Sequence, residues 1–237
     1  MRRAFPAAIL CAILGVPASA AVLLPGATLS GGDYIDDLIP TTDPRLSPAL
    51  GSGEAVANRT EDGIVDFDPD VIEGLYDIDG ILRSTALALP GGTGFLYQIG
   101  VLDRSGAGDN GLVSISISGF ADYSVDIAPV SDTDGIFAPD IIRSADGDTI
   151  TIDPSFGGSF LLPPGIGATF IEPYLISTDA PSFSLSGSGT AALFVDTFGT
   201  ESGPLAGSIA VPAAIPVPAG LPLLLLGLGT LALRRRR

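Results

Sequence analysis

The middle of the chain consists of short runs of β-forming residues that alternate with clusters of Gly, Pro, Asp and Ser. The run 112–118 (LVSISIS) places Val113, Ile115 and Ile117 on one side of an extended chain and serines on the other. Turn clusters recur about every ten residues, a spacing typical of antiparallel sandwiches. The sequence therefore predicts an all-β fold: a single antiparallel β-sandwich of jelly-roll or immunoglobulin-like type.

Several segments of this kind are expected to form strands. They are residues 81–89, 95–102, 112–118, 123–127, 149–153, 159–162, 168–171, 182–185 and 191–195. The residues from Gly119 to Asp122 are few enough to join the strands on either side in a hairpin. Asp146-Gly147 is a strong turn signal directly before the strand at 149–153.

The segments outside the predicted strands differ in composition. Residues 21–62 have little apolar periodicity and are expected to form an irregular N-terminal arm of an acidic domain that spans 21–201. One short helix is predicted at 68–73, where a proline occupies the first helical position. Residues 202–214 are rich in Pro, Gly and Ala, and this composition predicts a semi-rigid linker.

Residues 1–20 have the features of a secretory signal peptide. Two arginines follow the initial Met, residues 7–16 are apolar, and small residues precede the expected cleavage site at Ala18 and Ala20. The apolar run is too short to span a bilayer. We therefore expect export through the Sec translocon and a mature chain that begins at Ala21.

The C-terminal residues form a short proline motif, an apolar stretch and a cluster of arginines. The motif residues are Ile215, Pro216, Val217, Pro218 and Ala219. As a helix, residues 219–233 would extend about 22 Å, which is less than the roughly 30 Å hydrocarbon core of a bilayer. The residues expected to stay in the cytoplasm by the positive-inside rule are Arg234, Arg235, Arg236 and Arg237.

This tail resembles the VPLPA-type relative of the PEP-CTERM sorting signals of Gram-negative bacteria. Ile215 replaces the first valine of that motif and Val217 its leucine, whereas Pro216, Pro218 and Ala219 match. The resemblance covers the tail and not the body of the chain. It implies recognition by an exosortase, a membrane-embedded cysteine protease-transpeptidase, and transfer to the cell exterior. It also implies an association with exopolysaccharide and biofilm.

Charge and missing residue types exclude several partners and reaction classes. The formal net charge is −16, and the region between the terminal arginine clusters holds five Arg against 27 Asp and Glu. Such a body repels nucleic acids and anionic lipids. The chain has no His, which excludes a Ser-His-Asp triad, and no Lys, which excludes Schiff-base chemistry. The single cysteine, Cys11, lies in the predicted signal peptide.

Acidic loops are the candidate metal sites. Carboxylate oxygens are the ligands that Ca²⁺ prefers, so Ca²⁺ binding is one hypothesis for these loops. The other is that they are solvated turns, because Asp and Gly favour turns and the first loop lacks the glycine that an EF-hand requires. No other cofactor is expected. The candidates are Asp66, Asp68, Asp70, Asp132 and Asp134.

Together these features predict an exported, non-enzymatic protein of the cell surface or extracellular matrix. It would pass through the inner membrane as an intermediate and be processed by an exosortase at the signal over 215–237. A Ca²⁺-dependent, adhesin-like module that binds glycans or surfaces is the first alternative. A C-terminally anchored periplasmic protein without sorting is the second. An unusual carboxylate hydrolase is the third, and it requires two acids that converge in a cleft.

Overall fold

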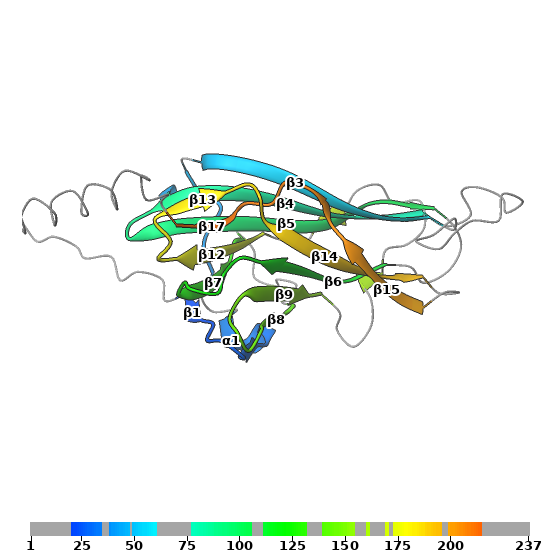
Figure 1. Cartoon of the computed structure of the whole chain (residues 1–237), viewed down its shortest axis with the longest axis horizontal. Coiled ribbons are helices and arrows are strands. Elements are labelled where there is room, and N and C mark those ends of the chain that lie inside the picture. The colour runs from blue at the N-terminus through cyan, green and yellow to red at the C-terminus, as the bar shows by residue number, and fades with distance from the viewer. Residues whose placement is uncertain are drawn as a thin grey trace, which may run out of the picture.

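Two antiparallel sheets pack against each other and enclose the core of the protein (Figure 1). The structure is a computed structural model. It describes residues 20–34, 38–47, 49–60, 77–105, 111–131, 139–154, 160–161, 169–170, 173–195 and 199–214. Within these residues nearly every element is a strand, which confirms the predicted all-β class.

The strands of the larger sheet are β1 (Ala21–Val22), β3 (Ala49–Thr60), β4 (Asp77–Leu89), β5 (Gly92–Ser105), β7 (Val125–Pro129), β11 (Thr169–Phe170), β12 (Tyr174–Thr178) and β16 (Ala206–Gly207). Of these, β3, β4 and β5 lie uppermost in Figure 1. In the described part of the chain the order is β1-β7-β12-β5-β4-β3-β16, and β11 also pairs with β5. The edge strand β1 pairs with β7 on one side.

The smaller sheet packs against the larger one. Its strands are β2 (Thr28–Leu29), β6 (Gly111–Ser118), β8 (Asp140–Arg143), β9 (Thr149–Asp153), β10 (Phe160–Leu161), β14 (Ser188–Val195) and β15 (Gly199–Pro204). The order is β15-β14-β6-β9-β8-β2, with β10 also on β6. A separate ribbon pairs β13 (Ser182–Ser184) with β17 (Val211–Ala213), and the short helical turns are α1 (Gly31–Tyr34) and η2 (Pro44–Leu46).

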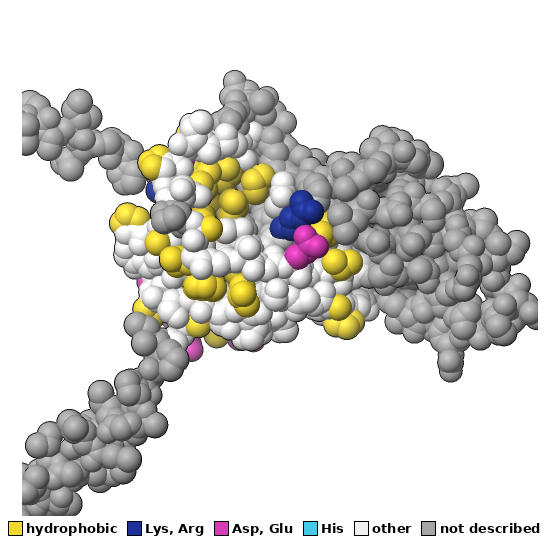
Figure 2. Space-filling model, turned by 90° about the horizontal axis from the view of Figure 1, so that it is seen from above, with side chains coloured by type: hydrophobic (Ala, Val, Ile, Leu, Met, Phe, Trp, Pro, Cys, Tyr) yellow, Lys and Arg dark blue, Asp and Glu magenta, His cyan; other side chains and the backbone are white. Residues whose placement is uncertain are grey.

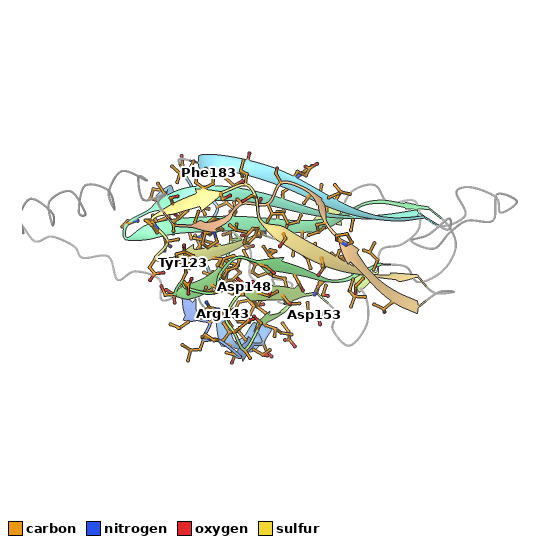
Figure 3. The ribbon with its side chains drawn as sticks, viewed as in Figure 1. Tyr123, Arg143, Asp148, Asp153 and Phe183 are labelled. Atoms are coloured by element: carbon orange, nitrogen blue, oxygen red, sulfur yellow. The ribbon has the colours of Figure 1, made fainter. Side chains whose placement is uncertain are left out.

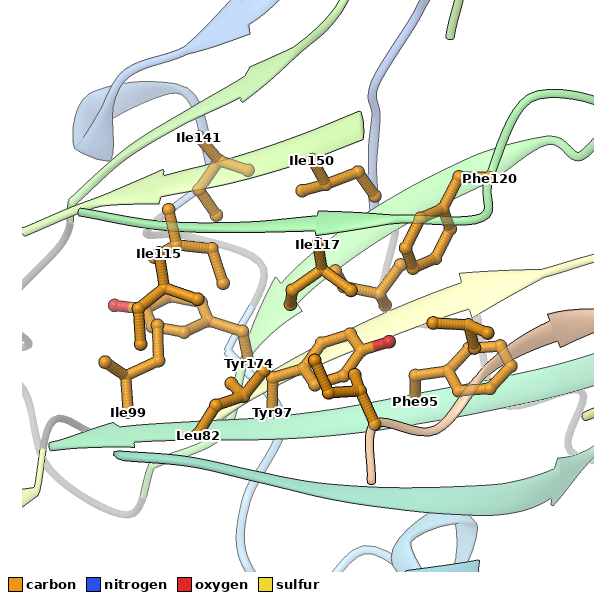
Figure 4. Packing of buried hydrophobic residues seen from close by; sticks show 14 of the residues in the cluster. Leu82, Phe95, Tyr97, Ile99, Ile115, Ile117, Phe120, Ile141, Ile150 and Tyr174 are labelled. Carbon is orange, nitrogen blue, oxygen red and sulfur yellow. The ribbon is translucent and has the colours of Figure 1, made fainter. Parts of the chain in front are cut away.

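The core lies between the sheets and follows the alternation of each strand. Phe95, Tyr97 and Ile99 point inward from β5 and meet Ile115 and Ile117 from β6 (Figure 4). All five side chains are at most 1% exposed. Burying large apolar and aromatic side chains is the main favourable term in folding, at about 1.5–3 kcal/mol for each side chain.

One bulge interrupts the predicted alternation in β6. Ile115 and Ile117 are buried as predicted, but at the start of the strand Leu112 is buried and Val113 is only half-buried. The ladder with β14 pairs Ala192 with Ser114 and the next residue, Leu193, with Leu112, so Val113 is the extra residue. A bulge of this kind shifts which side chains face the core.

A second apolar cluster covers the outer surface of the larger sheet. Its buried members are Ile39, Leu87, Ala128, Val130 and Leu175, and Ala20 and Leu46 pack against it. The segment over 38–47 crosses this surface, and its backbone is fixed by hydrogen bonds between Ile39 and the ends of β7. The N-terminal region is therefore tied to the sheet.

The predicted irregular arm over 21–62 is wrong for its second half, which contains the long strand β3. This strand carries little apolar periodicity because close packing requires glycine in it. A Cβ atom at Gly53 would lie 2.3 Å from the main-chain oxygen of Ser208. The small residues that make 49–60 look irregular allow a neighbouring segment to approach its backbone.

The predicted linker over 202–214 also differs from the structure, because these residues complete β15 and form β16 and β17. Ile209 and Ala210 are at most 1% exposed. The Tyr97 hydroxyl donates to the Ala210 carbonyl at 2.5 Å, and the Ala210 N–H donates to Ser84 Oγ at 2.9 Å. Small residues form this segment, so its burial left no apolar pattern in the sequence.

We expect Tyr97→Phe to lower the free energy of unfolding by about 2 kcal/mol, because the buried Ala210 carbonyl would lose its donor. Urea denaturation of the purified protein measures this. Tyr123→Phe is the control: Tyr123 is half-buried, and a change within about 0.5 kcal/mol is expected there. Equal effects of the two substitutions would contradict the assignment of Tyr97 as the anchor of this segment.

The predicted hairpin between residues 112–118 and 123–127 is wrong. β6 belongs to the smaller sheet and β7 to the larger one, so the residues from Gly119 to Asp122 cross between the layers. Phe120 is fully buried in this crossing and packs edge-on against Phe95, with ring centroids 6.1 Å apart. Burying the Phe120 ring in the core stabilises this crossing, and a tight turn would leave the ring exposed.

The turn predicted at Asp146-Gly147 is confirmed, since it joins β8 and β9 as an antiparallel pair. Gly147 has a φ of +78°, a conformation that glycine adopts without steric cost. The helix predicted at 68–73 lies outside the described residues.

Candidate functional site

A depression of about 530 Å³ opens on the outer surface of the larger sheet, beside the start of β1. Strands β7 and β12 and the β4–β5 turn form its walls. It is lined by Ala20, Arg45, Leu89, Pro90, Gly91, Gly92, Ser124, Asp126, Ser177, Thr178 and Asp179.

Two carboxylates, Asp126 and Asp179, line this depression. Asp126 is half-buried on β7, and burial raises the pKa of its carboxyl above the ordinary value. Asp179 is exposed, and its Oδ1 accepts the Ser124 N–H at 2.9 Å. The two acids therefore line one depression, and one of them is already bound to the backbone.

Among the described residues, Arg45 is the cation that lines the depression, and it is bound to a neighbouring carboxylate. Arg45 donates from Nε to Asp43 Oδ1 at 3.0 Å and from Nη2 to Asp43 Oδ2 at 2.8 Å. Asp43 also caps η2, because its Oδ1 accepts the Arg45 N–H at 2.8 Å. These bonds from Arg45 lower the pKa of the Asp43 carboxyl. The Arg45 guanidinium is therefore already paired with Asp43.

A buried arginine fixes the chain just beyond this depression. Arg143 is 3% exposed, and its guanidinium donates to four main-chain carbonyls. These are Gly147 from Nε at 2.9 Å, Leu23 from Nη1 at 2.9 Å, and Phe120 and Tyr123 from Nη2 at 2.8 Å each. Burial lowers the pKa of this guanidinium, which nevertheless stays charged at every physiological pH.

The Arg143 contacts join three separate parts of the chain. They connect the segment after β1, the crossing between the sheets and the β8–β9 turn. Arg143, Tyr123 and Asp148 lie at one end of the smaller sheet, and Asp153 lies toward the other end (Figure 3). The clamp therefore holds Leu23, three residues beyond the predicted signal-peptide cleavage site, in a fixed position.

The outer surface of the smaller sheet carries a regular array of hydroxyl groups, which we call the hydroxyl face. Cross-strand bonds join Ser116 to Thr151 at 2.7 Å and Ser118 to Thr149 at 3.0 Å. Asp140 and Asp153, opposite each other on β8 and β9, lie at one margin. By strand register, the members of the hydroxyl face are Ser114, Ser116, Ser118, Thr149, Thr151, Ser188, Thr190 and Ser202.

A second depression, of about 540 Å³, lies over β3 and β4. An ion pair there joins Arg83 Nε to Glu54 Oε2 at 2.9 Å, and both side chains are about half exposed. Figure 2 shows dark blue and magenta side chains in contact on this side of the molecule, among uncharged atoms and scattered hydrophobic side chains. An exposed pair of this kind contributes little to stability.

Most residues that the sequence singled out lie outside the described part of the chain. These are Ala18, the acids Asp66, Asp68, Asp70, Asp132 and Asp134, the motif from Ile215 to Ala219, and the arginines from Arg234 to Arg237. Ala20 is described and lines the first depression. Among the described residues, no group of three or more His, Cys, Asp or Glu is placed to hold a metal ion. No helix in the described segments is long and apolar enough to cross a membrane.

Asp126 and Arg143 were not among the residues predicted from the sequence. A signal exists for Arg143, because Ile141 and Arg143 share one side of a strand and the isoleucine marks that side as the core. No comparable signal marks Asp126, since its neighbours in the depression come from distant segments.

Comparison with protein-family models, curated proteins and solved structures found no match to this chain.

Proposed function

We propose that this is an exported, non-enzymatic protein of the cell surface or extracellular matrix of a Gram-negative bacterium. The Sec translocon exports it, and its C-terminal tail holds it for a time in the inner membrane. An exosortase then processes it at the motif over 215–219, and it becomes associated with exopolysaccharide or biofilm.

The observation that carries this proposal is the position of the two predicted processing sites relative to the fold. Among the described residues the first strand, β1, begins at Ala21, directly after Ala20. The last strand, β17, ends at Ala213, two residues before Ile215. Cleavage at both sites would leave every described strand of the domain in the product.

The hydroxyl face supports an association with polysaccharide. Hydroxyl side chains both donate and accept hydrogen bonds, as sugar hydroxyls do. Its described members are uncharged, whereas the body as a whole is strongly acidic. This face therefore offers hydrogen bonds to a glycan without charge repulsion, whereas the acidic parts of the body would repel an anionic polymer.

The proposal is tested by replacing the two motif prolines, Pro216 and Pro218, with alanine in the native host. The sorting enzyme must recognise this motif, so we expect the released fraction to fall by about tenfold or more. The full-length chain would accumulate in the inner membrane. Fractionation with immunoblotting measures both quantities.

Pro204→Ala is the matched control. This proline is exposed at the end of β15 and lies outside the motif. Its substitution should leave the released fraction unchanged. Normal release of the Pro216→Ala, Pro218→Ala protein would show that the motif has no part in sorting and would overturn the proposal.

A further inference from the structure

The predicted signal-peptide cleavage site lies at an ordered edge of the fold. Ala21 is paired with Ile127 and Val22 with Asp126 across β1 and β7. The Leu23 N–H donates to the Val125 carbonyl at 2.9 Å, and the Leu23 carbonyl accepts from Arg143 Nη1. The residues that follow the scissile bond are therefore paired with β7, and Leu23 is held through both its N–H and its carbonyl.

A half-buried carboxylate lies beside this bond. Asp126 is directly opposite Val22, and residues opposite each other in an antiparallel pair have Cβ atoms about 5 Å apart. The Ala21 nitrogen belongs to the residue directly before Val22 on the same strand. Ala20 and Asp126 also line the same depression, so the scissile bond and the carboxylate share one surface.

In the described part of the uncleaved chain, the Asp126 carboxylate has no hydrogen-bond or ion-pair partner. Arg45 lines the depression but is bound to Asp43, and Asp179 adds a second negative charge. Burial without a partner is unfavourable for a charged carboxylate, and it raises the pKa of Asp126. The described residues therefore supply no available cation to the depression.

We propose that removal of the signal peptide creates this cation, and that the new α-ammonium group of Ala21 forms an ion pair with Asp126. The inference rests on the proposed function, because it requires export and cleavage after Ala20. Hydrolysis of the Ala20–Ala21 amide consumes one water molecule. The Ala20 carboxylate leaves with the signal peptide, and the Ala21 amine takes up a proton below its ordinary pKa of about 7.7–8.0.

With the ion pair, the Asp126 carboxylate stabilises the folded mature protein. In the precursor, where the pair is absent, the same carboxylate destabilises the fold. The ion pair also raises the pKa of the Ala21 amine in the folded state. Its contribution to stability is then fully present below the pKa of the unfolded amine and is lost as pH rises through the pKa of the folded amine. The charged groups that face the amine are Asp126, Asp179 and Arg45 with its partner Asp43.

The composition of the chain allows a direct test. The sequence contains no Lys, so the α-amine of Ala21 is the one primary amine of the mature protein. Mature protein from the native host is treated with N-hydroxysuccinimidyl acetate between pH 6 and 9. Acetylation is followed by intact mass, and N-terminal sequencing first establishes that the chain begins at Ala21.

We expect the wild-type amine to react about tenfold more slowly at pH 7 than the amine of Asp126→Asn, which corresponds to a pKa about one unit higher. Asp179→Asn is the matched control, and it should change the rate much less than Asp126→Asn, because Asp179 is exposed and its Oδ1 accepts the Ser124 N–H. In 8 M urea all three proteins should react at one rate. Equal rates and pH profiles for folded wild type and Asp126→Asn would overturn the ion pair.

Thermal unfolding gives a second readout, because the effect of Asp126→Asn on the melting temperature should differ in sign between precursor and mature protein. In a precursor whose cleavage is blocked, Asp126→Asn should leave the melting temperature unchanged or raise it. In the mature protein the same substitution should lower it. A chain from the host that does not begin at Ala21 would overturn the proposed processing instead, so the two failures are distinguishable.

Discussion

Replacing Arg143 with methionine is expected to lower the free energy of unfolding by about 4 kcal/mol, since four main-chain carbonyls would lose a charged donor. Methionine retains much of the apolar volume of arginine and none of its N–H groups. For a domain of this size the loss corresponds to a melting temperature lower by roughly 8–16 °C. Urea and thermal denaturation of the purified protein measure both quantities.

Arg83→Met is the matched control, because Arg83 is about half exposed and its ion pair with Glu54 is on the surface. We expect a loss of at most about 1 kcal/mol there. Arg143→Lys should also be strongly destabilising, since a single ammonium group cannot reach carbonyls on three different segments. Similar losses for Arg143→Met and Arg83→Met would contradict the role of Arg143 as a structural clamp.

Gly92→Ala should destabilise the protein by about 3 kcal/mol, because the added Cβ atom has no space. It would lie 1.9 Å from the Thr178 carbonyl oxygen and 2.9 Å from Asp179 Cα, both main-chain atoms. Thr178 Oγ1 donates to the Thr93 carbonyl at 2.8 Å, which fixes β12 against β5 at this point. The strands must therefore separate, and the change is measured by urea denaturation.

The adjacent Gly91 provides the control for Gly92. Gly91 has a φ of +103°, and a Cβ atom there would meet nothing within 4 Å. Gly91→Ala should therefore cost only backbone strain, about 1 kcal/mol. If Gly91→Ala were as destabilising as Gly92→Ala, the close approach of β12 would not be the cause of the loss.

The strand pattern of the core was predictable because alternation reports burial directly. β6 and β9 match the predicted 112–118 and 149–153, and 81–89 and 95–102 lie within β4 and β5. Each of these strands places isoleucine, leucine or phenylalanine on the inner side and mostly polar or small residues on the other. Such a pattern identifies strands without any knowledge of their partners.

Pairing and boundaries were not predictable, since they depend on contacts between distant segments. The crossing at Phe120 looked like a hairpin turn because four residues can form either connection. The strand β12 lies between β7 and β5 and was not predicted, although Tyr174 and Ile176 are fully buried. The strands β3 and β17 were missed because small residues and prolines do not produce apolar periodicity.

The candidate site was also predictable only where its residues are close in sequence. The alternating serines of β6 were visible in the sequence, but the register that adds Thr149, Thr151 and Thr190 to the hydroxyl face was not. The depression beside Ala20 joins residues from positions 20 to 179. The half-buried Asp126 could not be recognised from neighbouring residues, whereas Ile141 marks the side of β8 that it shares with Arg143 as the core side.

Intact mass spectrometry of the protein fractionated from its native host measures processing at both ends of the β-domain. We expect a species that begins at Ala21, ends within residues 215–219 and is found outside the inner membrane. A chain that still carries Arg234 to Arg237 and remains in the inner membrane would contradict sorting. The protein would then be a C-terminally anchored periplasmic domain.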